Sequence, residues 1–555
     1  MMKKLAKAFL GLIAAVAMLF TGLALPSSAV AVGNYSITIG TQAKPVTSGH
    51  TFEAYQVFAG DLSEKDNNVT LSNISWGSGV DGDELLKALK TDNTFKDSLV
   101  NASSAADVAA ALTADNAAAF AKIAAAHLTT MTSGTGNYDA TAQTYTISGL
   151  AAGYYLVKDQ DNSLGDKTEA YTEFILRVVK SVTVEPKADV PTVEKKVWDT
   201  NNSATDANDA NDDKWSDSAD HDINDTVNFQ LTGSLPSNYD AYTTYAYKFT
   251  DTLSKGLTLD RNSIKVYAVK GTGDQQTKTE IKKLADGATG NDGYTVATAS
   301  YGNDATPDTD KYKGGNVLTI NFADLKQAAA ATDGETLTID KDTKIVVEYS
   351  ATLNADAVIG SAGNPNKVDL TFSNNPNGEG TGKTPEDVVT VFTFKIVANK
   401  VDENNQALEG AGFTLYKYNK NENKYEAVGD EIKGDTMTQF TFSGLDAGQY
   451  KLEETTTPAG YNTWEGLEFK IVAEHDATAD DLELKTLKFT DLNGKEINDF
   501  TVDTNKDAII TVVNKKGSNL PETGGIGTTI LYVAGAVCVI AAGVWFGLRR
   551  RNSTR

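Results

Sequence analysis

The chain has 555 residues, of which 40% are hydrophobic and 22% charged, a composition typical of folded domains and not of a disordered or polytopic membrane protein. Its formal net charge of −24 disfavours binding to the phosphates of nucleic acid. A single cysteine, Cys538, and four histidines exclude a disulfide framework and leave little for a Cys/His metal site. We therefore expect no nucleic-acid partner, no metal and no cofactor.

The N-terminus has the pattern of a secretory signal peptide. Three lysines precede an apolar run from Ala8 to Leu25, and the small residues Ala29, Val30 and Ala31 follow. The pattern predicts cleavage after Ala31, with Ala29 as the alternative. An uncleaved membrane anchor is the competing interpretation, which the shortness of the apolar run disfavours.

The region that follows reads as a series of β-rich domains. Short runs rich in β-branched and aromatic residues are separated by Gly, Asn and Asp, while an alanine-rich region at 83–128 predicts two helices. The expected fold class is mainly β, with tandem immunoglobulin-like β-sandwich domains and an α-helical insertion in the first. Prolines and composition divide the chain into a signal peptide (1–31), a first domain (32–187), a second domain (188–392), a third domain (393–516) and a C-terminal segment (517–555).

Two further features of the sequence concern a repeated phrase and an acidic segment. The phrase Ser148–Leu156 recurs as Ser443–Leu452, which predicts that the first and third domains share a fold. The segment from Asp199 to Asp225 is rich in Asp, Asn and Ser but lacks the glycine of an EF-hand loop. A solvated loop is therefore favoured there over a calcium site.

The C-terminus combines three features in a fixed order. A pentapeptide is followed by the apolar stretch Ile526–Leu548 and then by arginines, which alone predicts a transmembrane helix with its positive end inside. Together the features resemble the cell-wall sorting signal of Gram-positive surface proteins. The resemblance implies that a sortase cleaves the Thr523–Gly524 bond, transfers the threonyl carbonyl to an amine and leaves the protein anchored in the cell wall. The pentapeptide consists of Leu520, Pro521, Glu522, Thr523 and Gly524.

Processing would change the chemistry available to the mature chain. Loss of three lysines with the signal peptide and four arginines with the tail would take the net charge from −24 to −31. The only cysteine leaves with the tail. Any covalent cross-link in the mature chain must therefore use a group other than a thiol.

The third domain carries three motifs that are specific in combination. They are the strand Phe394–Asp402, the acidic segment Tyr450–Tyr461 and the last strand Ile509–Lys515. The set resembles collagen-adhesin B-type (CnaB) domains, which form an internal isopeptide bond between a lysine and an asparagine with the help of a carboxylic acid.

The CnaB resemblance implies that Lys400 is the lysine, Glu454 the acid and Asn514 the amide. A lysine buried among apolar side chains loses its charge, so its neutral amine can attack the amide carbonyl while the acid polarises the oxygen, and ammonia is released. Such a chain modifies itself once and is not an enzyme. A plain ion pair between Lys400 and Glu454 is the competing interpretation.

The second domain shows the same combination in different motifs. Strand alternation over residues 193–197 points Lys195 towards the core. Later strands supply an acid, Asp251, and an amide. These motifs resemble the middle domains of Spa-type major pilins, which implies a Lys195–Asn374 bond assisted by Asp251. Asn375 is the alternative amide, and ordinary packing without a bond is the competing interpretation.

The first domain is less complete. The segment Gly153–Asp159 corresponds to the acidic segment of the third domain, with an aspartate in place of the glutamate. No matching lysine and asparagine are found, so no isopeptide bond is predicted there.

A lysine between the first two domains has its own motif. The run Val182–Lys187 resembles the pilin motif, in which a lysine after Val-x-Val-Tyr-Pro accepts the next subunit, and this implies that Lys187 is the linking lysine. The run departs from the family because Glu185 replaces the usual tyrosine and the upstream tryptophan is missing. A solvent-facing linker lysine is the competing interpretation.

Along nearly its whole length the chain resembles a sortase-assembled major pilin. The resemblance implies a shaft subunit that a pilus sortase joins head to tail through Thr523 and Lys187, and that a housekeeping sortase anchors to peptidoglycan. Other copies of the chain, minor or tip pilins and a host-surface ligand are the partners it implies, with adhesion and biofilm formation as outcomes. Tension between Lys187 and Thr523 would cross only the second and third domains, where the cross-links are expected. The alternatives are a monomeric wall-anchored adhesin and a surface enzyme, which the scattered histidines disfavour.

Overall fold

The structure is a computed structural model of the chain. The signal peptide, Lys187 and the sorting pentapeptide lie outside the residues that it describes. The described residues are 35–42, 45–46, 49–65, 68–113, 115–129, 135–160, 163–164, 170–171, 173–185, 190–199, 214–376, 378–475, 482, 484–517, 535–542 and 544–545.

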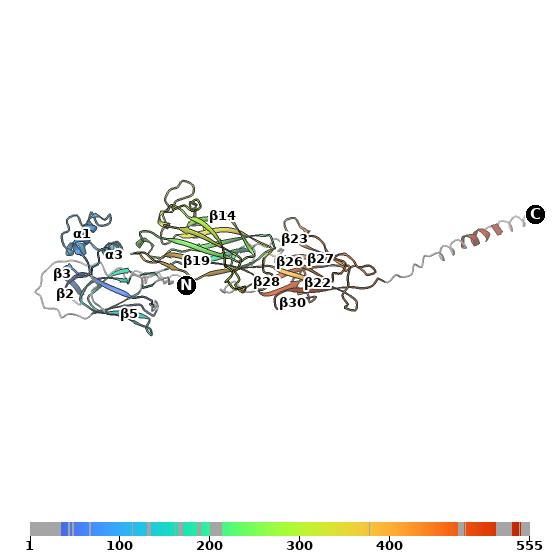
Figure 1. Cartoon of the computed structure of the whole chain (residues 1–555), viewed down its shortest axis with the longest axis horizontal. Helices are drawn as coiled ribbons and strands as arrows, with labels where there is room; N and C mark the ends of the chain where they lie inside the picture. The colour runs from blue at the N-terminus through green and yellow to red at the C-terminus, as the bar shows by residue number, and fades with distance from the viewer. Residues whose placement is uncertain are drawn as a thin grey trace, which may run out of the picture. The chain divides into compact units, whose positions relative to one another are not determined.

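The secondary structure is mainly β, which confirms the predicted fold class (Figure 1). Within the described residues six sheets form three successive pairs along the chain. The chain divides into two compact units, of which the first contains the first two pairs of sheets and the second, which includes Phe394–Glu474 and the chain from Thr486, contains most of the third pair.

The first pair of sheets has the strand orders β4-β5-β1-β8 and β3-β2-β6-β7. Strand β1 pairs antiparallel with β5 and parallel with β8, so the first and last strands are neighbours. The strands are β1 (Tyr35–Ile39), β2 (Phe52–Lys65), β3 (Asn68–Trp76), β4 (Thr135–Asp139), β5 (Thr144–Leu150), β6 (Gly153–Asp159), β7 (Glu173–Val178) and β8 (Val182–Val184).

Three helices form the predicted α-helical insertion, where the sequence had predicted two. They are α1 (Gly82–Thr91), α2 (Ala105–Ala111) and α3 (Ala117–Ala125), and Figure 1 shows α1 and α3 with strands β2 and β3. Ser104 starts α2 with a capping box to Asp107, which separates it from α1. Consecutive residues of β6 serve two cores, since Leu156 packs with the helices and Val157 between the two sheets.

The second pair of sheets is the largest, with the strand orders β10-β9-β12-β18-β14-β15 and β11-β21-β19-β13-β17-β16. Strand β20 pairs with β19 beside this path. The elements are β9 (Val193–Asp199), β10 (Lys214–Ser216), β11 (Ser218–Asp220), β12 (Thr226–Gly233), η2 (Tyr239–Ala241), β13 (Tyr247–Leu253), β14 (Leu257–Lys270), η3 (Gly273–Gln275), β15 (Thr277–Glu280), β16 (Thr295–Ser300), β17 (Asn316–Phe322), η4 (Leu325–Gln327), β18 (Lys344–Leu353), β19 (Asn364–Ser373), β20 (Thr381–Lys383) and β21 (Asp387–Phe392).

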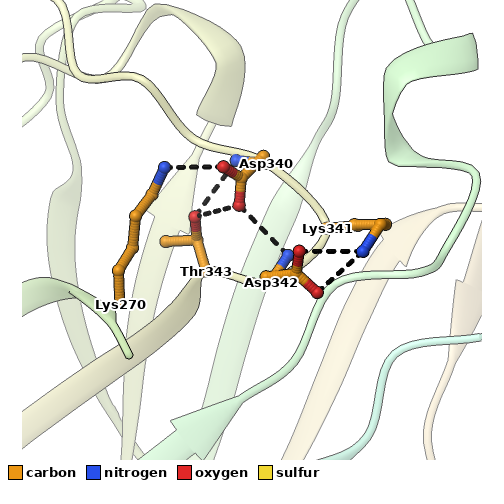
Figure 2. A network of polar contacts seen from close by, with 5 residues as sticks. All are labelled: Lys270, Asp340, Lys341, Asp342 and Thr343. Atoms are coloured by element: carbon orange, nitrogen blue, oxygen red, sulfur yellow. Dashed lines mark hydrogen bonds and ion pairs between the residues drawn. The ribbon is translucent and has the colours of Figure 1, made fainter. Parts of the chain in front are cut away.

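A polar network fixes the turn that leads into β18 (Figure 2). Asp340 accepts hydrogen bonds from Lys270 Nζ at 2.7 Å and from the Thr343 hydroxyl at 3.0 Å. The bond from Lys270 lowers the pKa of Asp340. The turn therefore begins β18 at a defined register, and this strand carries one of the groups described below.

The third pair of sheets repeats the strand arrangement of the first. Its orders are β26-β22-β31-β30 and β24-β23-β27-β28-β29, with β25 beside β23, and β22 pairs antiparallel with β26 and parallel with β31. The strands are β22 (Phe394–Asp402), β23 (Gly412–Asn419), β24 (Lys424–Ala427), β25 (Ile432–Lys433), β26 (Gln439–Leu445), β27 (Gly448–Thr456), β28 (Leu467–His475), β29 (Leu484–Thr490), β30 (Phe500–Val502) and β31 (Ala508–Asn514).

Glu431 fastens the segment around β25 to β27. Its side chain pairs with Lys433 at 2.7 Å and accepts hydrogen bonds from the hydroxyls of Thr455 and Thr456 at 2.7 and 2.6 Å. The hydrogen bond from Lys433, followed by those from the two threonines, lowers the pKa of Glu431 to about 2. The ionised carboxylate is therefore the form that this contact stabilises.

Within the described part of the C-terminal segment, residues 535–542 and 544–545 are helical. Among the residues that the structure describes, no helix is both long and apolar enough to cross a membrane. Most of the predicted transmembrane stretch Ile526–Leu548 lies outside them.

Candidate functional site

Lys195 and Asp251 form a fully buried pair in the second domain. Lys195 points inward from β9, and its Nζ contacts Asp251 Oδ2 of β13, which belongs to the facing sheet. Burial lowers the pKa of Lys195 and raises the pKa of Asp251, and the charge of each partner opposes the shift of the other. Because burial is the larger influence on both groups, the pair favours the neutral amine and the neutral acid.

Tyr349 of β18 connects this pair to an asparagine. Its hydroxyl accepts hydrogen bonds from Lys195 Nζ at 3.0 Å and from Asn366 Nδ2 at 2.7 Å, and donates one to Asp251 Oδ1 at 3.0 Å. The rings of Phe229 and Tyr349 stack on each other with centroids 5.3 Å apart, and the amine lies against both, 5.3 Å from each centroid. The amine is thus held in an apolar enclosure with one amide close by.

Asn366 has the environment of a reacting amide. It lies on β19 opposite Leu253 of β13, two residues along from Asp251, and its side chain is fully buried. Its Oδ1 accepts no hydrogen bond from any residue that the structure describes. The carbonyl is therefore free to receive a hydrogen bond from the acid when the amide rotates.

The structure separates Asn374, the amide expected from sequence, from Lys195. Asn374 follows the end of β19, eight residues beyond Asn366, which is about 26 Å along an extended strand. Its carbonyl accepts a hydrogen bond from Tyr171 N, and the preceding Ser373 pairs with Ala246, five residues before Asp251. The alternative Asn375 lies one residue further still. The amide near Lys195 is therefore Asn366, and the expectation for Asn374 is corrected accordingly.

Lys400, Glu454 and Asn514 lie together in the core of the third domain. Lys400 Nζ is 3.9 Å from Glu454 Oε1 and also contacts the carbonyl oxygens of Val401 and Val512, both at 3.3 Å. Burial lowers the pKa of Lys400, and the charge of Glu454 partly opposes that shift. The parallel pairing of β22 with β31 aligns Lys400 with Val512, two residues before Asn514, and so places amine and amide side by side.

Glu454 holds the amide of Asn514 with both carboxyl oxygens. Asn514 Nδ2 lies 2.7 Å from Oε1 and 2.9 Å from Oε2, and the main-chain N–H of Trp464 donates to Oε2 at 2.7 Å. Asn514 Oδ1 has no hydrogen-bond partner among the described residues. A half-turn about the Cβ–Cγ bond of Asn514 exchanges its two amide atoms and places the carbonyl oxygen against the acid.

The first domain has a different set of side chains at the corresponding positions. Its strand register matches that of the third domain, so that Thr41 corresponds to Lys400 and Asp159 to Glu454. Asp159 is buried, and its Oδ1 lies 2.7 Å from Nδ1 of His50. A threonine supplies no amine at this position, and the absence of an isopeptide bond from this domain stays a prediction.

The sequence analysis missed Asn366 and Tyr349. Both lie on the inward face of alternating strands, where Val368, Leu370 and Phe372 follow Asn366. An asparagine in line with three apolar residues is a recognisable signal for a buried amide. Tyr349 carried no comparable signal, because an inward tyrosine is common in a core.

Comparison with known proteins identifies two segments of the chain. Residues 394–486 match the SpaA family, described as a prealbumin-like fold domain, and residues 512–554 match the LPXTG cell wall anchor motif. The second match confirms the predicted sorting signal. The protein is therefore anchored in the cell wall and exposed at the cell surface.

The similarities to individual proteins are weaker than these two family matches. Over 130 residues the chain is 30% identical to the trypsin-resistant surface T6 protein of Streptococcus pyogenes serotype M6, an alignment that spans 21% of this chain and only 23% of that protein. The solved T6 backbone pilin of the same serotype has a TM-score of 0.47 at 16% identity, covering 88% of this chain and all of the pilin. The full-length major pilin SpaD of Corynebacterium diphtheriae has a TM-score of 0.39 at 19% identity, covering 87% of this chain and 98% of SpaD.

Proposed function

We propose that this cell-wall-anchored protein, which resembles the backbone pilins of Gram-positive bacteria, is the shaft subunit of a covalently assembled pilus. A pilus sortase would cleave after Thr523 and transfer its carbonyl to the amine of Lys187 in the next subunit. A housekeeping sortase would then attach the finished fibre to peptidoglycan. Minor or tip pilins and a host-surface ligand are the further partners that the family resemblance implies.

The observation that carries the proposal is the presence of two buried lysine–acid–asparagine clusters between the two proposed attachment points. One cluster is Lys195, Asp251 and Asn366, and the other is Lys400, Glu454 and Asn514. We infer that each forms an isopeptide bond, because each places a buried amine beside a buried amide with an acid in contact.

The distribution of the clusters suits a fibre under tension. A pull between Lys187 and Thr523 crosses the second and third domains, and each has one cluster. The first domain lies outside this path, and at the position of the lysine it has Thr41. Cross-links of this kind do not depend on redox conditions, which suits a mature chain that has no cysteine.

Loss of Lys187 tests the assembly step. Cell-wall extracts boiled in detergent should give a ladder of high-molecular-weight species from the wild type and a single band from Lys187→Ala. Lys180→Ala is the matched control, because Lys180 is an exposed lysine just upstream. A single band from the wild type would instead favour a monomeric wall-anchored adhesin, and a ladder that persists in Lys187→Ala would refute Lys187 as the linking residue.

A further inference from the structure

The two clusters differ in how the acid meets the amide. In the third domain Glu454 contacts Asn514 Nδ2 directly with both oxygens. In the second domain the acid reaches the amide through a hydroxyl, since Tyr349 Oη is hydrogen-bonded to both Asp251 and Asn366. The same oxygen also accepts the hydrogen bond from Lys195 Nζ.

Side-chain length accounts for this difference. Aspartate is one methylene shorter than glutamate, and Asp251 pairs across the strands with Val368 and not with Asn366. Its two oxygens are engaged by Lys195 and Tyr349. The hydroxyl of Tyr349 therefore extends the reach of the shorter acid to the amide.

We propose that Tyr349 is a catalytic residue for the Lys195–Asn366 bond, passing a proton from the attacking amine to the departing amide nitrogen. The inference rests on the proposed isopeptide bond. It assigns a role to a hydroxyl that touches the nucleophilic nitrogen and the leaving nitrogen at 3.0 and 2.7 Å.

The step balances without any further reactant. The neutral amine of Lys195 attacks Cγ of Asn366, a C–N bond forms and the Cγ–Nδ2 bond breaks. One proton leaves Nζ for Tyr349 Oη while the proton of the hydroxyl goes to Nδ2, so that ammonia departs and the tyrosine is restored. The acid group of Asp251 stabilises the hydroxyl and the charge that develops during the transfer.

Burial keeps each group in the form that this step needs. Burial raises the pKa of Tyr349 well above its ordinary value, so its hydroxyl keeps the proton that it donates. Burial also lowers the pKa of Lys195, which favours the neutral nucleophile. Lys195 is fully buried against the stacked rings of Phe229 and Tyr349, so water is excluded from the amine.

The test compares rates of bond formation in the mature ectodomain, residues 32–523, made by cell-free synthesis and stopped with acid at intervals. Tyr349→Phe removes a single oxygen and should slow formation of the Lys195–Asn366 peptide by about tenfold or more. Tyr239→Phe is the matched control, because Tyr239 is a fully buried tyrosine of the same domain whose hydroxyl has no hydrogen-bond partner among the described residues. Mass spectrometry of the branched peptide reports the rate, and the third-domain cross-link in the same chain reports correct synthesis.

The outcomes separate the two levels of the argument. If the wild type never forms the branched peptide, the proposed cross-link is wrong and the role of Tyr349 falls with it. If the wild type forms it and Tyr349→Phe forms it equally fast, the cross-link stands and the role of Tyr349 is overturned.

A second variant guards against a simple loss of folding. Asp251→Glu combined with Tyr349→Phe copies the third domain, in which a glutamate contacts the amide directly. It should form the bond faster than Tyr349→Phe alone, because the longer acid no longer needs the hydroxyl. A double variant that is no faster would overturn the inference that Tyr349 extends the acid.

Discussion

Replacing Lys400 should make the third domain extensible. A Lys400–Asn514 bond would carry tension from β22 directly to the end of β31 and would leave the chain between those residues unloaded. Lys400→Met removes the amine and retains an apolar side chain of similar length in the core. The hydrogen bonds between the strands would then bear the load and could break.

The expected extension follows from the length of the protected chain. Between Lys400 and Asn514 lie 113 residues, and at about 3.5 Å per residue they would add about 390 Å when pulled straight. The two residues lie on adjacent strands in the folded domain, so almost none of this length is already spanned.

Single-molecule force spectroscopy measures this directly. The mature chain contains no cysteine, so Ala188→Cys and Ser518→Cys supply attachment points at the two ends of the segment that contains the loaded domains. Lys395→Met is the matched control, because Lys395 lies on the same strand but on its solvent side, paired with Asp507. A step of about 390 Å should appear in Lys400→Met alone. The same step in the wild type, or no such step in the variant, would refute the cross-link in this domain.

Three further predictions concern the individual groups. The measured mass of the intact wild-type ectodomain should be about 34 Da below the mass calculated from its sequence, because two ammonia molecules are lost. Asn366→Ala should reduce this deficit by about 17 Da, whereas Asn374→Ala should leave it unchanged. A wild-type mass equal to the calculated mass would contradict both bonds. His50→Ala should destabilise the first domain by about 2 kcal/mol, because Asp159 loses a buried partner at 2.7 Å. Hydrogen exchange of the main-chain amides in that domain measures the change. Unaltered protection would contradict the predicted loss of stability. Because the pKa of Glu431 is lowered, its contribution to stability is present above pH 4.5, the ordinary carboxyl value, and is lost as the pH falls to about 2. The free energies of unfolding of wild type and Glu431→Gln, measured with urea, should therefore converge over that range. A constant difference between them would argue against the contact.

Strand alternation predicted much of the fold and part of the clusters. The pattern of residues 193–197 pointed Lys195 inward, and the structure places it in the core. The motifs of the third domain identified three residues that lie together, because the first and last strands of that domain are adjacent and the motifs sit on them. Alternation is a local property and therefore readable from sequence.

The identity of the amide in the second domain depends on contacts between strands that are distant in sequence. Asn366 and Asn374 are eight residues apart, so strand alternation predicts the same orientation for both side chains, and both are fully buried. Alternation alone therefore does not distinguish them. The pairing of β13 with β19 determines which of the two amides lies near the acid, because it places Asn366 opposite Leu253 and close to Asp251. Register between strands distant in sequence depends on the whole sheet, which a single sequence does not reveal.

The prediction of two helices in the first domain was wrong because the signal for a helix boundary was overlooked. Alanine favours helix throughout residues 83–128, so composition alone gave no boundary between α1 and α2. The boundary is a capping box, in which Ser104 and Asp107 satisfy each other's main-chain donors. That spacing was readable in the sequence but was outweighed by the alanine content.

The position of Asn366 has a mechanical consequence for the second domain. A bond from Lys195 to Asn366 shields the chain between them but leaves residues 367–393 in the line of force, including β20 and β21. In the folded domain β21 runs back beside β19, with Val389 opposite Asn366, so the two ends of this segment begin close together. Peeling the segment away would lengthen each subunit by about 90 Å before the covalent backbone stops it. A fibre built in this way would yield by a fixed amount under a sudden pull and recover when the hairpin re-forms.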